Sequence, residues 1–269
     1  MRQYVSEAPL ENGCLSVEGK KFRYMNSVLR VEEGDMMDVR LPGGILQPMT
    51  VAKVDRNGKK IILQAAGDEC SESKGVHARA AENALFPYEL WLIQFVAKPP
   101  KMDLIIRQAV ECGVAKILPV EGEFCQKGNI ESARKKSGGG DDRWQRIVTE
   151  AREQSGSPVE TEILHCRSLD ETCRLVSSLT KENPKGDAAA LVLYERSEGT
   201  LSIGRALADA GNAKKIFLAV GAEGGISPGE IERLKDAGFT PVHIKTNILR
   251  CETAALYGAA AVQTVLGGE

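Results

Sequence analysis

Long hydrophobic runs are missing from this chain of 269 residues. No uninterrupted apolar stretch approaches the ~20 residues that a membrane-spanning helix needs. The first residues, MRQYVSEAPLENG, lack the apolar core of a secretory signal peptide. Hydrophobic residues nevertheless make up 42% of the chain, which is enough for buried cores. These features predict a soluble, cytoplasmic protein with no membrane partner.

Patterns typical of disulfide frameworks and structural metal sites are also absent. The seven cysteines are an odd number, and no two of them form a C-x-x-C pair. Only three histidines are available as partners for a nucleophilic cysteine. We therefore expect reduced thiols, most of them in the core, and no metal site.

A strong excess of positive charge is missing too. The net charge is -2 and the isoelectric point is about 6.1, whereas indiscriminate nucleic-acid binders are usually basic. Residues 98–152 nevertheless carry eleven Lys and Arg against eight Asp and Glu, an excess of three. A selective RNA-binding enzyme can use local basic patches, so the composition disfavours RNA binding without excluding it.

The first part of the chain has the pattern of a small β-barrel. Short apolar or alternating runs are separated by turn sequences such as Pro42-Gly43-Gly44 and Arg56-Asn57-Gly58. The expected strands are CLSVEG, DMMDVRL, MTVAKV and KKIILQAA, with a short helix around residues 21–29. Residues 68–83 are polar and read as a linker. We predict a domain boundary at residue 72, with one domain over 1–72 and another over 73–269.

From about residue 90 the pattern changes to alternating strands and helices, which predicts an α/β fold with a parallel sheet covered on both faces. The expected strands are LWLIQFVA, AKILPVE, AALVLYE, KIFLAVG and PVHIK. The expected helices span residues 102–112, 143–154, 169–181, 201–210, 228–237 and 252–266. Ligands of such sheets bind in the loops at the carboxyl ends of the strands.

The segment SARKKSGGGDD, residues 132–142, is basic, rich in glycine and without periodicity. We interpret it as a mobile surface loop. The alternative is a flexible arm that touches phosphates.

A glycine-rich loop follows the strand KIFLAV and precedes a well-marked helix. Ser227 is a good N-cap, Pro228 suits the first helical position, and Glu230 completes a capping box. Gly238 is positioned to end the helix. The glycines in Gly221-Ala222-Glu223-Gly224-Gly225 allow a tight turn and close approach to a ligand. The loop lacks the Lys-Ser/Thr pair of a phosphate-binding P-loop, so a ligand site and a purely structural turn both remain open.

A second strand-to-helix junction lies further along the chain. The strand PVHIK is followed by Thr246 to Ala254 and then by a helix whose small residues allow close packing. Arg250 sits at this junction beside the presumed ligand loop. The alternative to a functional role is a structural salt bridge to Glu252 or Glu223.

The two segments GAEGG and ILRCETA, about twenty residues apart, resemble the paired signature of SPOUT methyltransferases. The chain is most similar to the RsmE branch, the 16S rRNA uridine-N3 methyltransferases. Other matching pieces in the same order are VLR followed by Gly34-Asp35, then ECGV with Pro119, then Arg143-Trp144, Glu150-Ala151 and Gln154-Ser155-Gly156. The resemblance is collinear over nearly the whole chain.

The resemblance implies a trefoil knot in the C-terminal domain, a PUA-like N-terminal barrel that binds RNA, and a homodimer. It implies S-adenosyl-L-methionine as the methyl donor and 16S rRNA of the small ribosomal subunit as the substrate. The residues implied to bind the cofactor lie in three loops, and they are Leu193, Tyr194, Glu195, Val220, Gly221, Gly224, Gly225, Ile244, Ile248, Leu249 and Thr253.

Two residues are candidates for the chemistry of methyl transfer. Uridine N3 carries a proton, so a group must accept that proton or stabilise the negative charge left on the base. Arg250 is the candidate for charge stabilisation. Glu223 is a candidate base, although we favour a role in orienting its loop. Arg23, Arg30 and Arg143 are candidate RNA contacts, with a solvated surface as the alternative.

The sequence departs from the family pattern at several positions. Ala222 replaces a proline and Cys112 a leucine. Glu123-Phe124-Cys125 stands where an acid-Arg-Ser triplet is usual, and Ser157 replaces an arginine. The last two changes remove basic side chains that could touch RNA or a partner subunit. Alternatives are therefore a tRNA or another rRNA site as substrate, a silent RNA-binding homologue, or a nucleotide-binding α/β protein.

Overall fold

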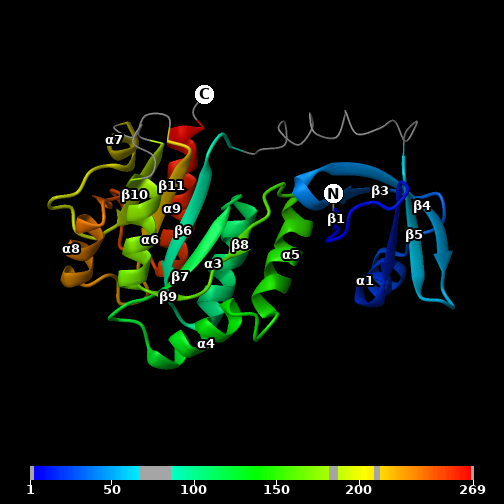
Figure 1. The fold of residues 1–269 in the computed structure, drawn as a ribbon, viewed down its shortest axis with the longest axis horizontal. Helices are drawn as coiled ribbons and strands as arrows, with labels where there is room; N and C mark the ends of the chain where they lie inside the picture. The colour runs from blue at the N-terminus through cyan, green and yellow to red at the C-terminus, as the bar shows by residue number, and fades with distance from the viewer. Residues whose placement is uncertain (1–2, 67–85, 182–186, 209–212, 268–269) are drawn as a thin grey trace. The chain divides into compact units, whose positions relative to one another are not determined.

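The computed structural model describes residues 3–66, 86–181, 187–208 and 213–267 (Figure 1). The chain divides into two compact units. The first comprises Met1–Leu85 with Arg152–Glu160, and the second comprises Phe86–Ala151 with Thr161–Glu269. The predicted boundary at residue 72 and the predicted linker over 68–83 lie outside the described residues. Among the helices that are described, none has both the length and the apolar character needed to cross a membrane.

The strands described in the first unit form one sheet. Its order is β1 (Tyr4–Val5), β3 (Met36–Arg40), β4 (Leu46–Asp55), β5 (Lys60–Ala65) and β2 (Cys14–Glu18). Side chains alternate along these strands, and Val39, Met49 and Leu63 are fully buried on one face. The helix expected around residues 21–29 is confirmed as α1 (Gly19–Tyr24) running into a π-helical turn, η1 (Met25–Leu29), and η2 spans Pro42–Gly44.

A segment distant in sequence completes the first unit. The buried side chain of Arg40 donates hydrogen bonds to the carbonyl oxygens of Gly44 and Gly156, each at 2.8 Å. The backbone amide of Gly43 donates to the carboxylate of Glu160 at 3.0 Å. These bonds hold the chain that follows α5 (Arg143–Ser155) against the turn of η2.

The strands described in the second unit form a seven-stranded sheet in which every recorded pairing is parallel. Its order is β12 (Thr240–Val242), β10 (Ala188–Leu193), β11 (Lys215–Val220), β6 (Glu89–Phe95), β7 (Lys116–Glu121) and β8 (Glu162–Ile163), and β9 (Arg167–Ser168) also pairs with β7. The expected α/β class and parallel sheet are confirmed.

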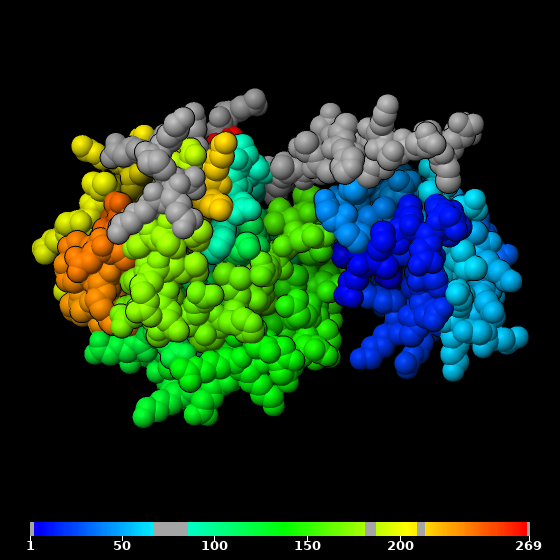
Figure 2. Space-filling model, in the orientation of Figure 1, coloured from blue at the N-terminus to red at the C-terminus, as the bar shows by residue number. Residues whose placement is uncertain are grey.

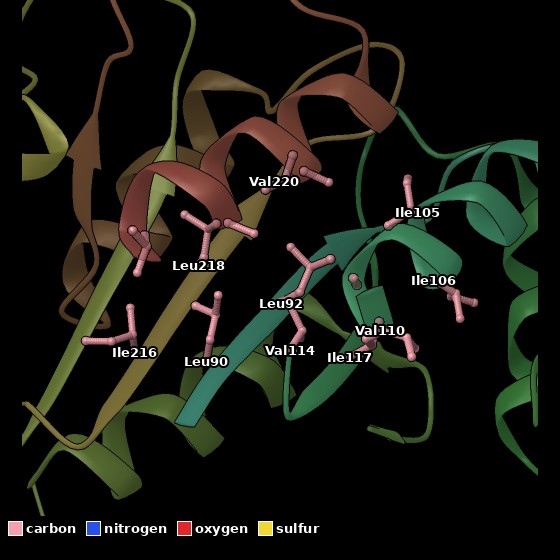
Figure 3. Packing of buried hydrophobic residues seen from close by; sticks show 14 of the residues in the cluster. Leu90, Leu92, Ile105, Ile106, Val110, Val114, Ile117, Ile216, Leu218 and Val220 are labelled. Carbon is pink, nitrogen blue, oxygen red and sulfur yellow. The ribbon is translucent and has the colours of Figure 1, made fainter. Parts of the chain in front are cut away.

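Helices cover both faces of this sheet, and every residue of the central strands β6 and β11 after the first one is therefore buried. On one face lie α3 (Pro99–Glu111), α4 (Lys127–Ser137), α5, α7 (Ile203–Ala208) and α9 (Cys251–Leu266). Figure 3 shows Leu92, Leu218 and Ile105 in this apolar layer. The other face carries α6 (Leu169–Lys181) and α8 (Pro228–Asp236). Figure 2 shows atoms of the α6 region, drawn in yellow-green, at the surface turned toward the viewer.

Two predictions from sequence are wrong. Residues 132–137 are not a mobile loop, since they belong to α4, where Ala133 is buried and Arg134 forms a two-point ion pair with Glu121 at 2.5 and 2.7 Å. The strand expected over PVHIK ends at Val242, because the chain turns away there into the loop before α9. The predicted end of the helix over 201–210 lies outside the described residues.

Alanine substitutions at Gly44 and Gly43 test whether the segment after α5 packs as part of the first unit. Both have a positive φ, but a Cβ on Gly44 would lie 2.4 Å from the carbonyl oxygen of Pro158, whereas a Cβ on Gly43 would meet nothing within 4 Å. We expect Gly44→Ala to lower the free energy of unfolding by about 1–3 kcal/mol more than Gly43→Ala. Chemical denaturation would measure both, and equal losses would contradict the packing described.

Candidate functional site

Three loops of the second unit meet at one edge of its sheet. They follow β10, β11 and β12, which are neighbouring parallel strands, so their carboxyl ends lie together. Together with the start of α9 they enclose a cavity of about 450 Å³. Such a place is where ligands of parallel sheets bind, and its size is within the range of small-molecule sites.

The residues predicted to bind a cofactor line this cavity, with one exception. Leu193, Tyr194 and Glu195 come from the first loop, Val220, Gly221, Gly224 and Gly225 from the second, and Ile244, Ile248 and Leu249 from the third. Thr253 does not line the cavity, since it is exposed in the first turn of α9. The two candidates for the chemistry, Glu223 and Arg250, also line it.

The glycine loop is a tight turn and a cavity wall at the same time. The amide of Gly225 donates to the carbonyl oxygen of Ala222 at 3.0 Å, and Gly225 has a φ of 76°. A Cβ on Gly221 would lie 2.8 Å from the carbonyl carbon of Gly225, so a side chain there would force the turn open. The sequence left open whether this loop is a ligand site or a structural turn, and the structure is compatible with both.

The predicted capping box after this loop is confirmed. The hydroxyl of Ser227 accepts a hydrogen bond from the amide of Glu230 at 3.2 Å, and the carboxylate of Glu230 accepts one from the amide of Ser227 at 2.8 Å. The other carboxylate oxygen of Glu230 accepts from the amide of Glu123 at 2.7 Å. Glu230 is only 1% exposed, so this one buried group joins the loop after β7 to the glycine loop.

Lys101, which the sequence analysis missed, holds the acidic side chains of the site. Its ammonium lies 3.1 Å from a carboxylate oxygen of Glu252 and 3.8 Å from one of Glu223. Glu223 also accepts a hydrogen bond from the amide of Lys98 at 3.1 Å. Lys101 lies in the first turn of α3, and no local pattern in the sequence connects it with loops so much later in the chain.

Arg250 is not part of the ion-pair cluster formed by Lys101, Glu223 and Glu252. The sequence allowed a structural salt bridge from Arg250 to Glu252 or Glu223, but Lys101 takes that place. Arg250 is exposed at the N-cap of α9, and within the described residues it forms no ion pair. Its guanidinium is thus available to a ligand in the cavity.

The cluster stabilises the charged forms of its members. Partial burial opposes the charge on Lys101, but the hydrogen bond with Glu252 and the charges around it raise the pKa of Lys101 above its usual value. Burial likewise opposes the charge on Glu252, yet hydrogen bonds from its own amide, Cys251 and Lys101 lower its pKa. Burial and the contact with Glu252 raise the pKa of Cys251 to about 12, so this thiol stays protonated at neutral pH.

The predicted RNA contacts differ in their surroundings. Arg23 and Arg30 are exposed on α1 and directly after η1, and neither has an ion-pair partner among the described residues. Arg143 is instead paired with Asp103, its guanidinium lying 2.6 Å from the carboxylate, although 53% of its side chain is exposed. The structure thus leaves Arg23 and Arg30 more available than Arg143.

Replacing Lys101 tests the cluster. Lys101→Met would leave the partly buried carboxylates of Glu223 and Glu252 without their cation, so we expect the free energy of unfolding to fall by about 1–2 kcal/mol. Lys235→Met is the matched control. Within the described residues Lys235 pairs with the exposed Glu232, so its loss should cost less than about 0.5 kcal/mol.

The same comparison has a defined pH dependence. Because the pKa of Glu252 is lowered in the folded protein, its charged form stabilises the fold fully above a carboxyl's usual pKa. This stabilisation is lost as pH falls through the lowered pKa. Because the pKa of Lys101 is raised in the folded protein, its charged form stabilises the fold fully below an amine's usual pKa. This stabilisation is lost as pH rises through the raised pKa. The stability difference should therefore be constant between about pH 5 and pH 10. A difference that changes within this window would contradict the assignment.

Comparisons with known proteins agree with this geometry. A family model described as an RNA methyltransferase domain matches residues 84–263. The chain is 31% identical to the ribosomal RNA small subunit methyltransferase E of Aquifex aeolicus, over 95% of this chain and 96% of the relative. It is 23% identical to that of Bacillus subtilis, over 97% of this chain and 92% of the relative.

Among solved structures, the fold is similar to a ribosomal RNA small subunit methyltransferase E from Neisseria gonorrhoeae bound to S-adenosyl methionine. The TM-score is 0.75 with 24% identity, and the match covers 98% of each chain. The resemblance identified in the sequence is thereby confirmed. The chain belongs to the ribosomal RNA small subunit methyltransferase E family of RNA methyltransferases.

Proposed function

We propose that this protein transfers the methyl group of S-adenosyl-L-methionine to N3 of a uridine in the 16S rRNA of the small ribosomal subunit. The observation that carries the proposal is the cavity, since three separate loops predicted to bind this cofactor line it together. Relatives that match nearly the whole chain are named as methyltransferases of small-subunit ribosomal RNA. A ribosomal substrate would place the protein in the cytoplasm.

The lining of the cavity fits this cofactor. Leu193 and Ile248 supply apolar contacts for an adenine ring, and the glycine loop brings backbone groups close enough to hydrogen-bond a ligand. The carboxylate of Glu195 also faces the cavity, where it suits a positively charged or hydroxyl-bearing group. When bound, the cofactor supplies an electrophilic methyl group on a sulfonium.

The protein's own contribution is to position the base and to stabilise charge. In-line displacement at the methyl group requires the nucleophilic nitrogen to be held in contact and in line. Transfer of the N3 proton to solvent water leaves negative charge on the uracil, and the guanidinium of Arg250, which has no ion pair within the described residues, is the group that stabilises it. Glu223 orients its loop rather than acting as the base, because Lys98 and Lys101 already engage its carboxylate.

The first unit serves RNA binding in this proposal, as a PUA-like barrel over residues 1–72. Arg23 and Arg30 contact phosphates, and Arg143 adds a contact from the second domain, residues 73–269, which forms a trefoil knot. We also propose a homodimer. Tyr257 and Val265 on α9 are 48% and 43% exposed, and such apolar side chains on a helix suit a contact with a second copy.

The experiment that tests the function uses labelled S-adenosylmethionine and small ribosomal subunits that lack the modification. We expect label to appear as 3-methyluridine in 16S rRNA after nucleoside analysis. Label in a different nucleoside or RNA would contradict the assigned substrate. The absence of any label, from protein shown to bind the cofactor, would contradict the reaction.

Removing the guanidinium of Arg250 tests its role. We expect Arg250→Ala to lower kcat/KM for the subunit by at least about a hundredfold, the size of effect seen when a charge-stabilising donor is lost. Affinity for S-adenosylmethionine, measured by calorimetry, should change little. Arg205→Ala, which removes an exposed arginine of α7 outside the cavity, is the control. Retained turnover in Arg250→Ala would rule out the proposed role.

The salt dependence of RNA binding tests the role of the basic residues of the first unit. We expect the double variant Arg23→Ala/Arg30→Ala to bind the RNA substrate more weakly and to reduce the slope of log affinity against log salt by about 2. Arg233→Ala should leave the slope unchanged, because Arg233 pairs with Asp170 on the surface of the second unit. An unchanged slope in the double variant would show that neither arginine contacts phosphate.

A further inference from the structure

Phe124 lies in an unusual position for a phenylalanine. It belongs to the turn between β7 and α4, and 48% of it is exposed. Large apolar side chains are usually withdrawn into a core, and Phe124 packs in none of the core clusters formed by the described residues. Its exposure therefore needs a physical reason.

The turn that carries Phe124 is held firmly. The amide of Cys125 donates to the carbonyl oxygen of Gly122 at 3.1 Å, and the thiol of Cys125 lies 3.3 Å from the amide of Gly122. The amide of Glu123 donates to the buried carboxylate of Glu230. These bonds fix the backbone on both sides of Phe124, so the position from which its ring projects is defined.

The same turn is attached to the glycine loop beside the cavity. Glu230 binds Glu123 with one carboxylate oxygen and Ser227, directly after the loop, with the other. A Cβ on Gly224 would lie 2.8 Å from the Cβ of Phe124 and 3.2 Å from the first carbon of its ring. Gly224 lines the cavity, so the ring of Phe124 lies against the outer side of that wall.

The cavity whose wall Phe124 packs against has a lining that matches the chemistry of a nucleobase. Ile248, another cavity residue, is 89% exposed, so a second apolar side chain is open to solvent at this site. Arg250 on the cavity wall carries a guanidinium that the described residues leave unpaired. Proteins that bind single-stranded nucleic acid stack its bases on exposed aromatic rings and meet its charge with cationic groups of the same site.

We propose that Phe124 is a stacking platform for a base of the RNA substrate beside the cavity, next to Gly224 of its wall. The inference rests on the proposed function, in which an RNA strand brings uridine to this cavity. Phe124 carries no charge, so what it can offer a nucleic acid is the face of its ring.

The test is a series of variants in the full chain, assayed for methyl transfer to small ribosomal subunits that lack the modification. We expect Phe124→Ala and Phe124→Leu to raise KM for the subunit about tenfold, as loss of one stacked base does, with kcat changed less than about twofold. Phe124→Tyr and Phe124→Trp should keep a KM near that of the unchanged chain. Affinity for S-adenosylmethionine should be the same throughout.

Phe124→Leu is the matched control, since it keeps an apolar side chain against Gly224 but removes the ring face. A Leu variant equal to the Tyr variant would show that apolar packing suffices and would overturn the proposal. So would variants with altered oligomeric state in light scattering, because Phe124 would then serve a contact between copies. Turnover that is normal in Phe124→Ala contradicts this inference alone, whereas an unchanged chain without turnover overturns the proposed function as well.

Discussion

The side-by-side arrangement of three parallel strands determines where the chemistry of the second unit can occur. Because β12, β10 and β11 are neighbours and run in the same direction, the loops that follow them end at the same edge. Residues from 193 to 250 are thereby collected around one cavity. Parallel strands need covering helices on both faces, and those helices in turn supply the remaining residues of the site.

Two charged groups then hold the loops in place. Glu230 is buried and binds backbone amides of two different loops, so it sets the distance between the turn after β7 and the glycine loop. Lys101 reaches from α3 to Glu223 and Glu252, which joins the glycine loop to the start of α9. With these carboxylates engaged, Arg250 is left as the cation that a ligand can use. These contacts make Glu230 and Lys101 positioning residues and leave Arg250 available to a ligand.

Much of this arrangement could be predicted from sequence. The apolar runs of β6, β7, β10 and β11 and the capping box at Ser227 depend on neighbours close in the chain, and the structure confirms them. The resemblance also indicated 12 of the 21 residues that line the cavity. Thr253 does not line the cavity, because in the first turn of α9 its side chain is exposed to solvent.

The features that were missed depend on contacts between distant segments. Helix α4 has a basic, glycine-ended sequence with little amphipathic character, and it forms because Ala133 is buried and Arg134 pairs with Glu121. Lys101 gains its role only when α3 meets loops from the far end of the chain. The segment after α5 joins the first unit through Arg40, a residue far earlier in sequence. Local patterns contain no information about such partners.

The central claim is that the three loops form the binding site for the methyl donor. A crystal structure of the protein with S-adenosylmethionine tests it most directly. The account predicts the adenosyl group within the cavity, between the loop of Tyr194, the glycine loop of Gly221 and the loop of Ile248, with the methyl group directed toward Arg250. Density for the cofactor at any other place, with this cavity empty, would contradict the account.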